Sequence, residues 1–470
     1  MKKSNKSILI VSYSFVVILF MIIINYVYFL LFKADSIVNN TYNKRSDVIE
    51  KRVLRGNIYS ADFEVLATTI ENEDGTVSRF YPFGNMYAHV VGRYDKGKTG
   101  VELSHNFELL KVDKYDTQTL KNEISGVRTK GYNVVTTLDS KLQEVAYKSL
   151  AGENGAVIVL EPSTGKILAM VSEPSYDPNT IFDDWESLSD ENDENSALLN
   201  RAINGLYPPG STFKVVMAME YIIENKEYDK YSFKCTGTTK YETDNISCHN
   251  KKKHGNVNLY KSLAYSCNTS FANIGMSVNW DCLRELCEKL GFNTPLDFES
   301  YKIITGSFEC SSTIGLGEQI QTSIGQGKTT ISPMQNALIM CAVANKGEIM
   351  EPYVADYLCD ENGNIVEEYN ERNSVKVIDE TVAQAVIDNL KGVTSIGTAK
   401  TLKNIDCEIY GKTGSAQYDS TDNAHAWFVG CASPEDKESI VVAVLVENGK
   451  TGSKSAVPIA KKIIEAYITQ

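Results

Sequence analysis

The chain has 470 residues, more than a single domain would normally hold, and its 43% of hydrophobic residues suffice for a sizeable core. Its formal net charge of −13 argues against a nucleic-acid partner. The ten cysteines include no Cys-x-x-Cys pair, so we expect most of them to be small buried hydrophobic residues.

An apolar run without charges, residues 8–32, is long enough to cross a bilayer. Three lysines precede it (Lys2, Lys3 and Lys6), and this bias favours a cytoplasmic N-terminus with the chain beyond about residue 34 outside. A cleaved signal peptide is the alternative, but the run is longer than the apolar part of such a signal, and no small-x-small cleavage site follows it. We therefore expect a single-pass protein of the cell membrane, held there by residues 8–32.

The sequence predicts a tail and membrane helix over residues 1–33, a small module over 34–150 and a large domain over 151–470. In the module, short mixed segments alternate with Gly and Asp turns, a pattern typical of irregular α+β structure. A strand over 134–138 and a helix over 140–150 close it.

The large domain begins with two apolar strands, 155–160 and 166–172, joined by a turn. The acidic run 183–195 is expected to be a solvated loop. Helical patterns then follow at 211–223, 259–279, 332–345 and 379–390, strands at 408–418, 425–431 and 439–446, and a last helix at 458–468. Strands at both ends with helices between predict an α+β domain with one sheet of sequence-distant strands.

The stretch Tyr207-Pro-Pro-Gly-Ser-Thr-Phe-Lys214 suggests catalysis. Two prolines and a glycine end the preceding structure, and a buried helix begins at Ser211. Lys214 follows one turn later on the same face, which gives a nucleophile beside a candidate base. The alternative is that Ser211 only caps the helix and that Lys214 only extends to solvent. Ser163-Thr-Gly-Lys166 has the same spacing but lies in the predicted hairpin turn.

Acyl transfer also needs a proton shuttle and donors for the oxyanion. Ser266-Cys-Asn268 offers a hydroxyl and an amide on one turn, and Lys412-Thr-Gly-Ser415 lies on a predicted strand. Gly414 would let a substrate backbone approach that strand closely. Similar triplets occur elsewhere: Ser277-Val-Asn279 inside a helical pattern, Lys98-Thr-Gly100 in the small module, and Lys450-Thr-Gly452 in a loop.

In order and separation, Ser211-x-x-Lys214, Ser266-x-Asn268 and Lys412-Thr-Gly414 resemble the three motifs of the penicillin-recognising serine acyltransferases. The class B penicillin-binding proteins are the most similar branch. Further segments that resemble that branch are Arg55-Gly-Asn-Ile58, Val65-Leu-Ala67, Ala88-His-Val-Val-Gly92, Thr136-Thr-Leu-Asp139, Glu161-Pro-Ser-Thr-Gly165, Ser323-Ile-Gly-Gln-Gly327 and Ser332-Pro-Met-Gln335.

The resemblance implies a D,D-transpeptidase that cross-links peptidoglycan. Ser211 would attack the penultimate D-Ala carbonyl of a stem peptide, and Lys214 would take its proton. Ser266, polarised by Lys412 and Lys214, would pass a proton to the leaving amine, and Asn268 would hold the substrate amide.

For the substrate carboxylate the resemblance implies Lys412 and Thr413, and for the oxyanion the backbone N–H groups of Ser211 and Ser415. A second stem peptide would accept the acyl group, whereas β-lactams would stay on Ser211. The fold implied for 151–470 is a β-lactamase/transpeptidase-like domain, an antiparallel sheet flanked by helices. No metal or organic cofactor is expected. Residues 34–150 would be a docking or dimerisation pedestal, and a SEDS-family glycosyltransferase would be the membrane partner.

Three alternatives remain. A D,D-carboxypeptidase would use water in place of the acceptor amine. A β-lactamase or β-lactam sensor shares the motifs, but no Glu-x-x-Leu-Asn segment lies between the second and third of them to hold a deacylating water. A catalytically idle scaffold would not need all three motifs intact.

Two cysteines, Cys235 and Cys248, flank a polar loop before Ser266. They could form an extracellular disulfide or remain free. With His249 and His254 nearby a zinc site is conceivable, although the spacing differs from that of a tight zinc finger. We expect a free or disulfide-bonded pair and no metal.

Overall fold

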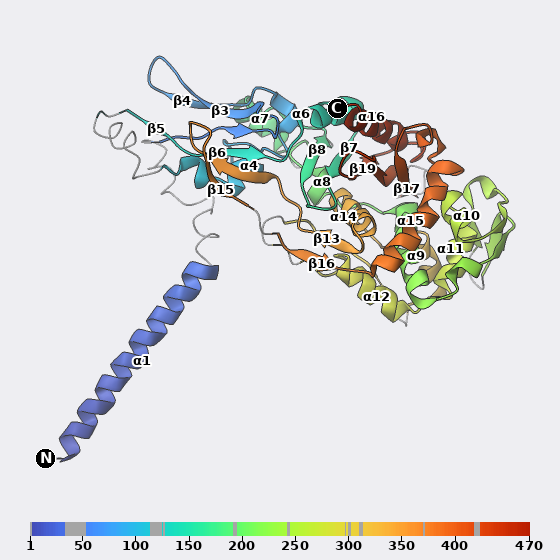
Figure 1. Cartoon of the computed structure of the whole chain (residues 1–470), viewed down its shortest axis with the longest axis horizontal. Helices are drawn as coiled ribbons and strands as arrows, with labels where there is room; N and C mark the ends of the chain where they lie inside the picture. The colour runs from blue at the N-terminus through green and yellow to red at the C-terminus, as the bar shows by residue number, and fades with distance from the viewer. Residues whose placement is uncertain are drawn as a thin grey trace.

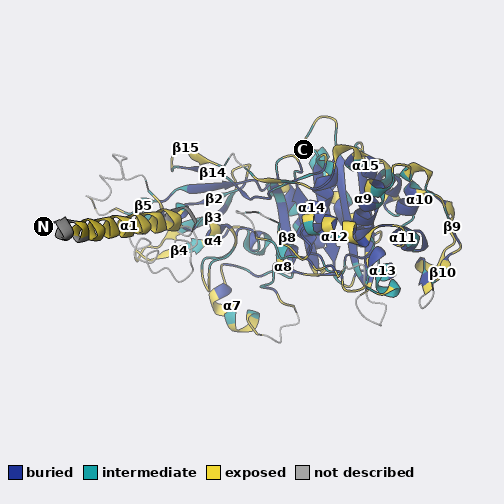
Figure 2. Ribbon diagram, turned by 90° about the horizontal axis from the view of Figure 1, so that it is seen from below, coloured by how far each residue is buried: buried dark blue, intermediate teal, exposed yellow. Residues whose placement is uncertain are grey.

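The computed structural model describes residues 2–32, 53–112, 125, 127–190, 195–241, 245–296, 298, 302–309, 314–369, 372–417 and 424–470. Figure 1 shows one long N-terminal helix and a folded body that contains two main sheets. Buried residues are concentrated in the part of the body built from residues beyond 150 (Figure 2).

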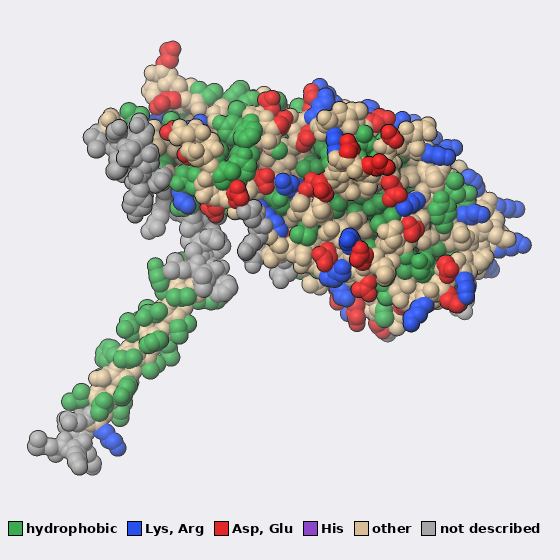
Figure 3. All heavy atoms as spheres, viewed as in Figure 1, with side chains coloured by type: hydrophobic (Ala, Val, Ile, Leu, Met, Phe, Trp, Pro, Cys, Tyr) green, Lys and Arg blue, Asp and Glu red, His purple; other side chains and the backbone are tan. Residues whose placement is uncertain are grey.

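Helix α1 (Lys2–Phe32) occupies the apolar run, as the sequence predicted. Its segment Ile8–Phe29 has a mean hydropathy of 2.7 and is not buried against the rest of the chain. Figure 3 shows hydrophobic side chains along the described length of this helix. The segment is long and apolar enough to cross a bilayer, so we describe α1 as a membrane anchor.

A six-stranded sheet dominates the part of the body that follows α1, in the order β15-β14-β6-β2-β3-β4. Its strands are β2 (Ile58–Tyr59), β3 (Val65–Glu71), β4 (Val77–Phe80), β6 (Asn133–Thr136), β14 (Ala355–Cys359) and β15 (Ile365–Glu368). Two of these strands therefore come from chain beyond residue 350, within the range that we assigned to the large domain. A short parallel pair, β1 (Val53–Leu54) and β5 (Thr129–Lys130), lies outside this sheet.

The second sheet has five antiparallel strands in the order β17-β18-β19-β7-β8. They are β7 (Gly155–Leu160), β8 (Ile167–Glu173), β17 (Glu408–Gln417), β18 (Ala424–Ser433) and β19 (Ile440–Val446). The sheet confirms the prediction that strands from both ends of the domain join, because β7 pairs directly with β19. Both strands are buried throughout, which explains their continuous apolar sequences.

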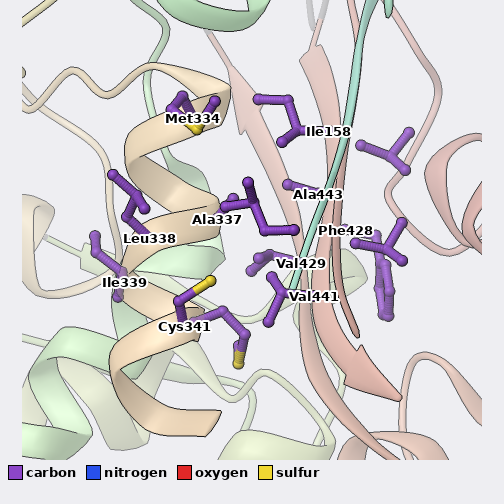
Figure 4. Close-up of a cluster of buried hydrophobic side chains, with 14 of the residues drawn as sticks. Ile158, Met334, Ala337, Leu338, Ile339, Cys341, Phe428, Val429, Val441 and Ala443 are labelled. Atoms are coloured by element: carbon purple, nitrogen blue, oxygen red, sulfur yellow. The ribbon is translucent and has the colours of Figure 1, made fainter. Parts of the chain in front are cut away.

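Helices cover this sheet, and their buried side chains form the core of the domain together with those of the strands. Helix α14 (Pro333–Ala344) begins at Ser332, whose hydroxyl accepts a hydrogen bond from the Gln335 N–H at 3.1 Å. Its side chains pack against strands β7, β18 and β19 (Figure 4). Helix α16 (Ala456–Ile468) packs on β18, β19 and α6 (Ser140–Leu150). These helices lie where apolar periodicity predicted them.

The remaining helices of the described chain are α4 (Gly100–Ser104), α7 (Ile181–Leu188), α8 (Arg201–Asn204), α9 (Lys214–Glu224), α10 (Leu259–Ala264), α11 (Asn268–Gly275), α12 (Trp280–Lys289), α13 (Leu316–Ser323) and α15 (Glu380–Ser395). Short paired strands are β9 (Phe233–Cys235) with β12 (Gly255–Val257), β10 (Thr238–Lys240) with β11 (Asn245–Ser247), and β13 (Glu348–Met350) with β16 (Ser374–Lys376).

The prediction of a solvated loop over 183–195 is wrong for its first half, because α7 extends to Leu188. Ile181, Trp185 and Leu188 follow one another at helical spacing and pack with Ala88 and Tyr176 in a small apolar cluster. The sequence prediction missed this helix because the segment has a high acidic content and only a narrow apolar face. Residues 191–194 lie outside the described residues.

Candidate active site

Ser211 lies in a tight turn at the start of α9. A 3-10 turn (Gly210–Phe213) leads into the helix, so the helical segment begins where the sequence predicted, with a tighter first turn. Gly210 has φ +54, and its N–H donates to the Gly325 carbonyl at 2.9 Å. A Cβ at Gly210 would lie 2.9 Å from the Ser415 carbonyl oxygen. Glycine is therefore needed for this turn to pack against β17.

Lys214 is the first residue of α9, and its side chain is 0% exposed. Its Nζ donates to the Asn268 Oδ1 at 2.6 Å, to the Ser266 carbonyl at 3.0 Å and to the Ser266 Oγ at 3.3 Å. The first two predicted motifs, 52 residues apart at Lys214 and Ser266, are thus in direct contact.

Lys412 approaches the same hydroxyl from β17. Its Nζ donates to the Ser266 Oγ at 3.0 Å and to the Thr413 carbonyl at 2.7 Å, and its side chain is also 0% exposed. The Ser266 hydroxyl therefore lies between two buried amines that come from distant parts of the chain. A hydroxyl in this position can exchange a proton with either amine.

Ser266 occupies the short turn between α10 and α11. It has φ +51, an uncommon conformation for a residue with a Cβ, and the N–H of the next residue donates to the Ser262 carbonyl at 2.9 Å. Asn268 opens α11, and its Nδ2 donates to the Ser247 carbonyl at 3.0 Å. The turn thus directs the Ser266 hydroxyl and the Asn268 amide toward Lys214.

Burial weakens the charged form of both lysines. It lowers the pKa of Lys214 to about 8. Burial, and then the nearby charge of Lys214, lowers the pKa of Lys412 well below its usual value. Two amines that share one dry site favour a state in which one of them is neutral, and a neutral amine can accept a proton.

Strand β17 completes the site at residues 413–415. The Thr413 Oγ1 is hydrogen-bonded to the Thr398 Oγ1 at 2.6 Å, and the Ser415 Oγ accepts from the Gly452 N–H at 3.3 Å. A Cβ at Gly414 would lie 3.0 Å from the Pro209 carbonyl oxygen. The predicted third motif therefore packs directly on the turn that carries Ser211.

The competing triplets lie elsewhere or have other partners. The Ser163 Oγ, in the turn between β7 and β8, donates to Glu438 at 3.1 Å. Lys98-Thr-Gly100 lies at the start of α4, where Thr99 is the N-cap and Gly100 the first helical residue. Ser277-Val-Asn279 is not inside a helix, contrary to the prediction, because the Asn279 side chain caps α12. Lys450-Thr-Gly452 is a loop as predicted, but its last residue contacts Ser415.

Three further residues position the site, and of these only Thr398 lies in no segment that the sequence analysis named. Thr398 contacts Thr413, Gly325 supports the Ser211 turn, and the Trp427 Nε1 donates to the Pro208 carbonyl at 3.0 Å. Trp427 is fully buried. Gly325 belongs to the segment Ser323-Ile-Gly-Gln-Gly327 and Trp427 to a predicted strand, but no local pattern reveals the contacts that these residues or Thr398 make.

Comparison with known proteins shows the family. Residues 155–465 match the family described as "Penicillin binding protein transpeptidase domain", and residues 55–134 match "Penicillin binding protein A dimerisation domain". The chain belongs to the penicillin-binding protein transpeptidases. The class B branch named from the motifs is therefore confirmed.

Some relatives match over nearly the whole chain. The chain is 30% identical to the peptidoglycan D,D-transpeptidase PbpA of Mycolicibacterium smegmatis, over 99% of both chains. The structure of penicillin-binding protein A from M. tuberculosis, an imipenem acyl-enzyme complex, superimposes with a TM-score of 0.80 at 28% identity, over 89% of this chain and 99% of that one. Pseudomonas aeruginosa PBP2 in complex with WCK 5153 gives a TM-score of 0.75 at 27% identity, over 89% and 96%.

Proposed function

We propose that this chain is a peptidoglycan D,D-transpeptidase that works through an acyl-enzyme on Ser211. The observation that carries the proposal is the position of the Ser266 hydroxyl between the Lys214 and Lys412 amines, at 3.3 and 3.0 Å. The relatives support it, because PbpA is named for this reaction and the solved relatives include β-lactam acyl-enzymes.

Acylation begins when neutral Lys214 takes the Ser211 proton and the Ser211 Oγ attacks the carbonyl carbon of the penultimate D-Ala. The negative charge that develops on the carbonyl oxygen is stabilised by the backbone N–H groups of Ser211 and Ser415. Support for this pairing comes from Gly210, which packs against the Ser415 carbonyl.

Collapse of the tetrahedral intermediate breaks the amide C–N bond. The proton that the leaving D-Ala amine requires comes from the Ser266 hydroxyl, which recovers one from the lysine pair. The amine of a second stem peptide then attacks the ester carbonyl, its proton returns to this relay, and Ser211 is released as the free alcohol. The donor thereby becomes cross-linked to the acceptor.

Substrate binding is assigned to Asn268 and to strand β17. Lys412 and Thr413 would engage the terminal carboxylate, since an ammonium and a hydroxyl are suited to an anionic group. Asn268 uses one acceptor site and one donor N–H within the protein, so its amide has capacity left for the substrate amide. A β-lactam presents a cyclic amide, and its leaving nitrogen stays tethered to the acyl group, so the Ser211 ester persists.

Orientation and partners belong to the same proposal. The N-terminus lies in the cytoplasm, α1 crosses the membrane, and the two sheets lie on the outer side, where stem peptides are cross-linked. Residues 34–150 serve as a docking or dimerisation pedestal and residues 151–470 as the catalytic domain. A SEDS-family glycosyltransferase supplies the glycan strands. The orientation is tested with a phosphatase that is active only outside the cytoplasm, fused to the C-terminus. We expect this fusion to be active, and an inactive fusion would contradict the orientation.

The reaction is tested with the detergent-solubilised full chain, a D-Ala-D-Ala stem peptide as donor and a second stem peptide as acceptor amine. We expect dimeric peptide together with free D-Ala in equal amounts. Ser211→Ala is expected to abolish both products, and the matched variant Ser163→Ala is expected to retain both. Release of D-Ala without dimer would instead indicate a carboxypeptidase.

A further inference from the structure

The loop after β19, which we call the 447–452 loop, contacts both elements that would supply the oxyanion N–H groups. Its first residue, Glu447, accepts a hydrogen bond from the Tyr207 hydroxyl at 2.7 Å. Its last residue, Gly452, donates its N–H to the Ser415 Oγ at 3.3 Å. The loop therefore joins the segment that leads into the nucleophile turn to strand β17.

The contact between Tyr207 and Glu447 is buried and charged. Tyr207 is 8% exposed, and the Glu447 carboxylate also accepts from the Arg201 Nε at 2.9 Å. Arg201 is held in turn, because its other nitrogens donate to the carbonyls of residues 195 and 196 at 2.7 and 3.2 Å. Burial, and then the charge of Glu447, raise the pKa of Tyr207, so its hydroxyl keeps the proton that it donates. A hydrogen bond to a carboxylate is stronger than one between neutral groups.

Tyr207 is also fixed through its backbone and its ring. Its N–H donates to the Ile331 carbonyl at 3.0 Å, and its carbonyl accepts the Ile331 N–H at 2.9 Å. The ring meets the rings of His425 and Trp427 edge to face, at 5.3 and 6.2 Å between centroids. A Cβ at Gly205 would lie 2.5 Å from the Tyr207 ring, so this glycine leaves the space that the ring fills. The two prolines that follow transmit this position to the nucleophile, because their φ angles are restricted.

The other end of the loop fits against the third motif. A Cβ at Gly452 would lie 2.6 Å from the Gly414 carbonyl oxygen and 2.3 Å from the Trp427 carbonyl oxygen, so glycine is needed for this close approach. The Gly452 carbonyl accepts the N–H groups of Ala456 and Val457 at 3.1 and 2.9 Å. These two residues begin α16, which packs on β18 and β19. The position of the loop against β17 is thus set by the core of the domain.

We propose that Tyr207 and Glu447 are positioning residues for acylation, an assignment that rests on the proposed function. The Ser211 and Ser415 N–H groups come from separate elements, so the oxyanion receives both hydrogen bonds only if the turn and β17 keep one relative position. The 447–452 loop sets that position, because it binds the segment before the turn at one end and the strand at the other. Tyr207 and Glu447 act through Ser211 and not on the substrate.

A role in stability alone predicts a different result. Loss of a buried tyrosine hydrogen bond would then lower the unfolding midpoint and leave acylation of the folded chain unchanged. Tyr176 provides the matched control, because it is also buried and its hydroxyl donates to the Ala88 carbonyl at 3.2 Å, in the small apolar cluster beside α7.

The test uses the detergent-solubilised full chain and penicillin, and it measures the dissociation constant of the first complex separately from the rate constant of acylation. Tyr207→Phe is expected to lower the rate constant by about 10- to 100-fold and to leave the dissociation constant unchanged, because the oxyanion forms only during the reaction. Tyr176→Phe is expected to lose a similar amount of stability, with both constants unchanged.

Infrared spectra of the acyl-enzyme give an independent measure of the oxyanion contacts. Penicillin that is isotope-labelled at the β-lactam carbonyl places the label in the ester carbonyl. Weaker hydrogen bonds to this oxygen in Tyr207→Phe should shift its stretching band to higher frequency, and Tyr176→Phe should give the wild-type band.

Two variants of Glu447 separate the hydrogen bond from the charge. Glu447→Gln keeps an acceptor for Tyr207 and removes the carboxylate that binds Arg201, so it should lose stability and retain most of the acylation rate. Glu447→Ala removes the acceptor and should lower the rate constant as Tyr207→Phe does. The double variant Tyr207→Phe/Glu447→Ala should be no slower than either single variant, since both act through one contact.

A Tyr207→Phe chain with the wild-type rate constant and the wild-type carbonyl band would overturn the proposal. Additive losses in the double variant, or equal losses of rate in Glu447→Gln and Glu447→Ala, would also overturn it. A wild-type chain that penicillin does not acylate would contradict the proposed function instead.

Discussion

The first sheet and the active site both bury charge, but only the first pairs it with opposite charge. Glu102, in α4, is fully buried, and its carboxylate receives the Arg55 Nε at 2.6 Å and the Arg79 Nε at 2.7 Å. Lys214 and Lys412 are equally buried, and both amines contact the same Ser266 hydroxyl. Neither lysine forms a salt bridge within the described chain.

The pKa shifts follow from this difference. Burial by itself would raise the pKa of Glu102, but Arg55 and Arg79 lower it below its usual value, so the group stays ionised. Burial lowers the pKa of Lys214, so the amine approaches neutrality. A buried charge that has partners of opposite charge stabilises the structure. A buried amine that has no such partner can lose its proton and act as a base. The two sites therefore should respond to substitution in opposite ways.

The largest expected effect is that of Lys214→Met on catalysis. This variant removes the proposed base and keeps the side-chain volume, so the second-order rate of acylation by penicillin should fall by about 10³-fold. The unfolding midpoint should not fall, because a buried amine that has no carboxylate partner has been replaced by an apolar group. Lys166→Met, in the competing Ser-x-x-Lys triplet, is the control and should acylate normally. A Lys214→Met chain that acylates at the wild-type rate would contradict the assignment.

Glu102→Gln should show the reverse pattern. It leaves two guanidinium groups buried without their carboxylate, so the free energy of unfolding should fall by about 3 to 5 kcal/mol. Acylation of the remaining folded protein should be unchanged. The matched variant is Glu71→Gln, whose exposed ion pair with Arg128 at 3.3 Å should contribute less than about 1 kcal/mol. Denaturant titration with a parallel acylation assay measures both quantities, and equal losses of stability in the two variants would refute the comparison.

A pH series sharpens the account of Lys214. The neutral amine is the active form, so the acylation rate should rise about tenfold per pH unit at low pH and level off above a pKa of about 8. The pKa of this lysine is lower in the folded state than in the unfolded state, so its contribution to stability is complete above about 10.5 and is lost as the pH falls through about 8. The difference in unfolding free energy between wild type and Lys214→Met should follow that course. A difference that does not change between pH 7 and 10 would show that the amine titrates normally.

The smallest effect is expected at Thr398. Thr398→Val removes the 2.6 Å hydrogen bond to Thr413, so the rate of acylation should fall by about 3- to 10-fold. Thr394→Val is the matched control, because the Thr394 hydroxyl donates to the Ile409 carbonyl on the same strand, away from the site. The control should lose stability but not acylation rate, and similar rates in both variants would show that Thr398 does not orient Thr413.

Much of the fold follows from local patterns, because apolar periodicity and caps are local properties. Ser332 with Pro333 predicted the start of α14, and the three C-terminal strands lie where one alternating segment and two apolar runs predicted them. The α7 helix was missed because acidic residues dominate the run 183–195, into which the helix extends, and because its buried face has only a few apolar residues. The addition of β14 and β15 to the first sheet depends on the long-range pairing of β14 with β6, which no local signal encodes.

The active site likewise has residues that local motifs predict and contacts that only the fold creates. The proximity of Lys214, Ser266 and Lys412 could be predicted because three short motifs occur in a known order. The contact between Thr398 and Thr413 could not be predicted, because each residue lies in an unrelated segment. Cys267 appeared only as the middle residue of its motif, and its proximity to Cys248 arises from the packing of α11 on β11.

The central claim is that Ser211 is the residue that becomes acylated. Peptide mass spectrometry of the full chain after reaction with penicillin tests it directly, with Ser211→Ala and Ser163→Ala beside the wild type. The account predicts one penicilloyl adduct on the peptide that contains Ser211, present in Ser163→Ala and absent in Ser211→Ala. An adduct on Ser163, or one that survives in Ser211→Ala, would contradict it.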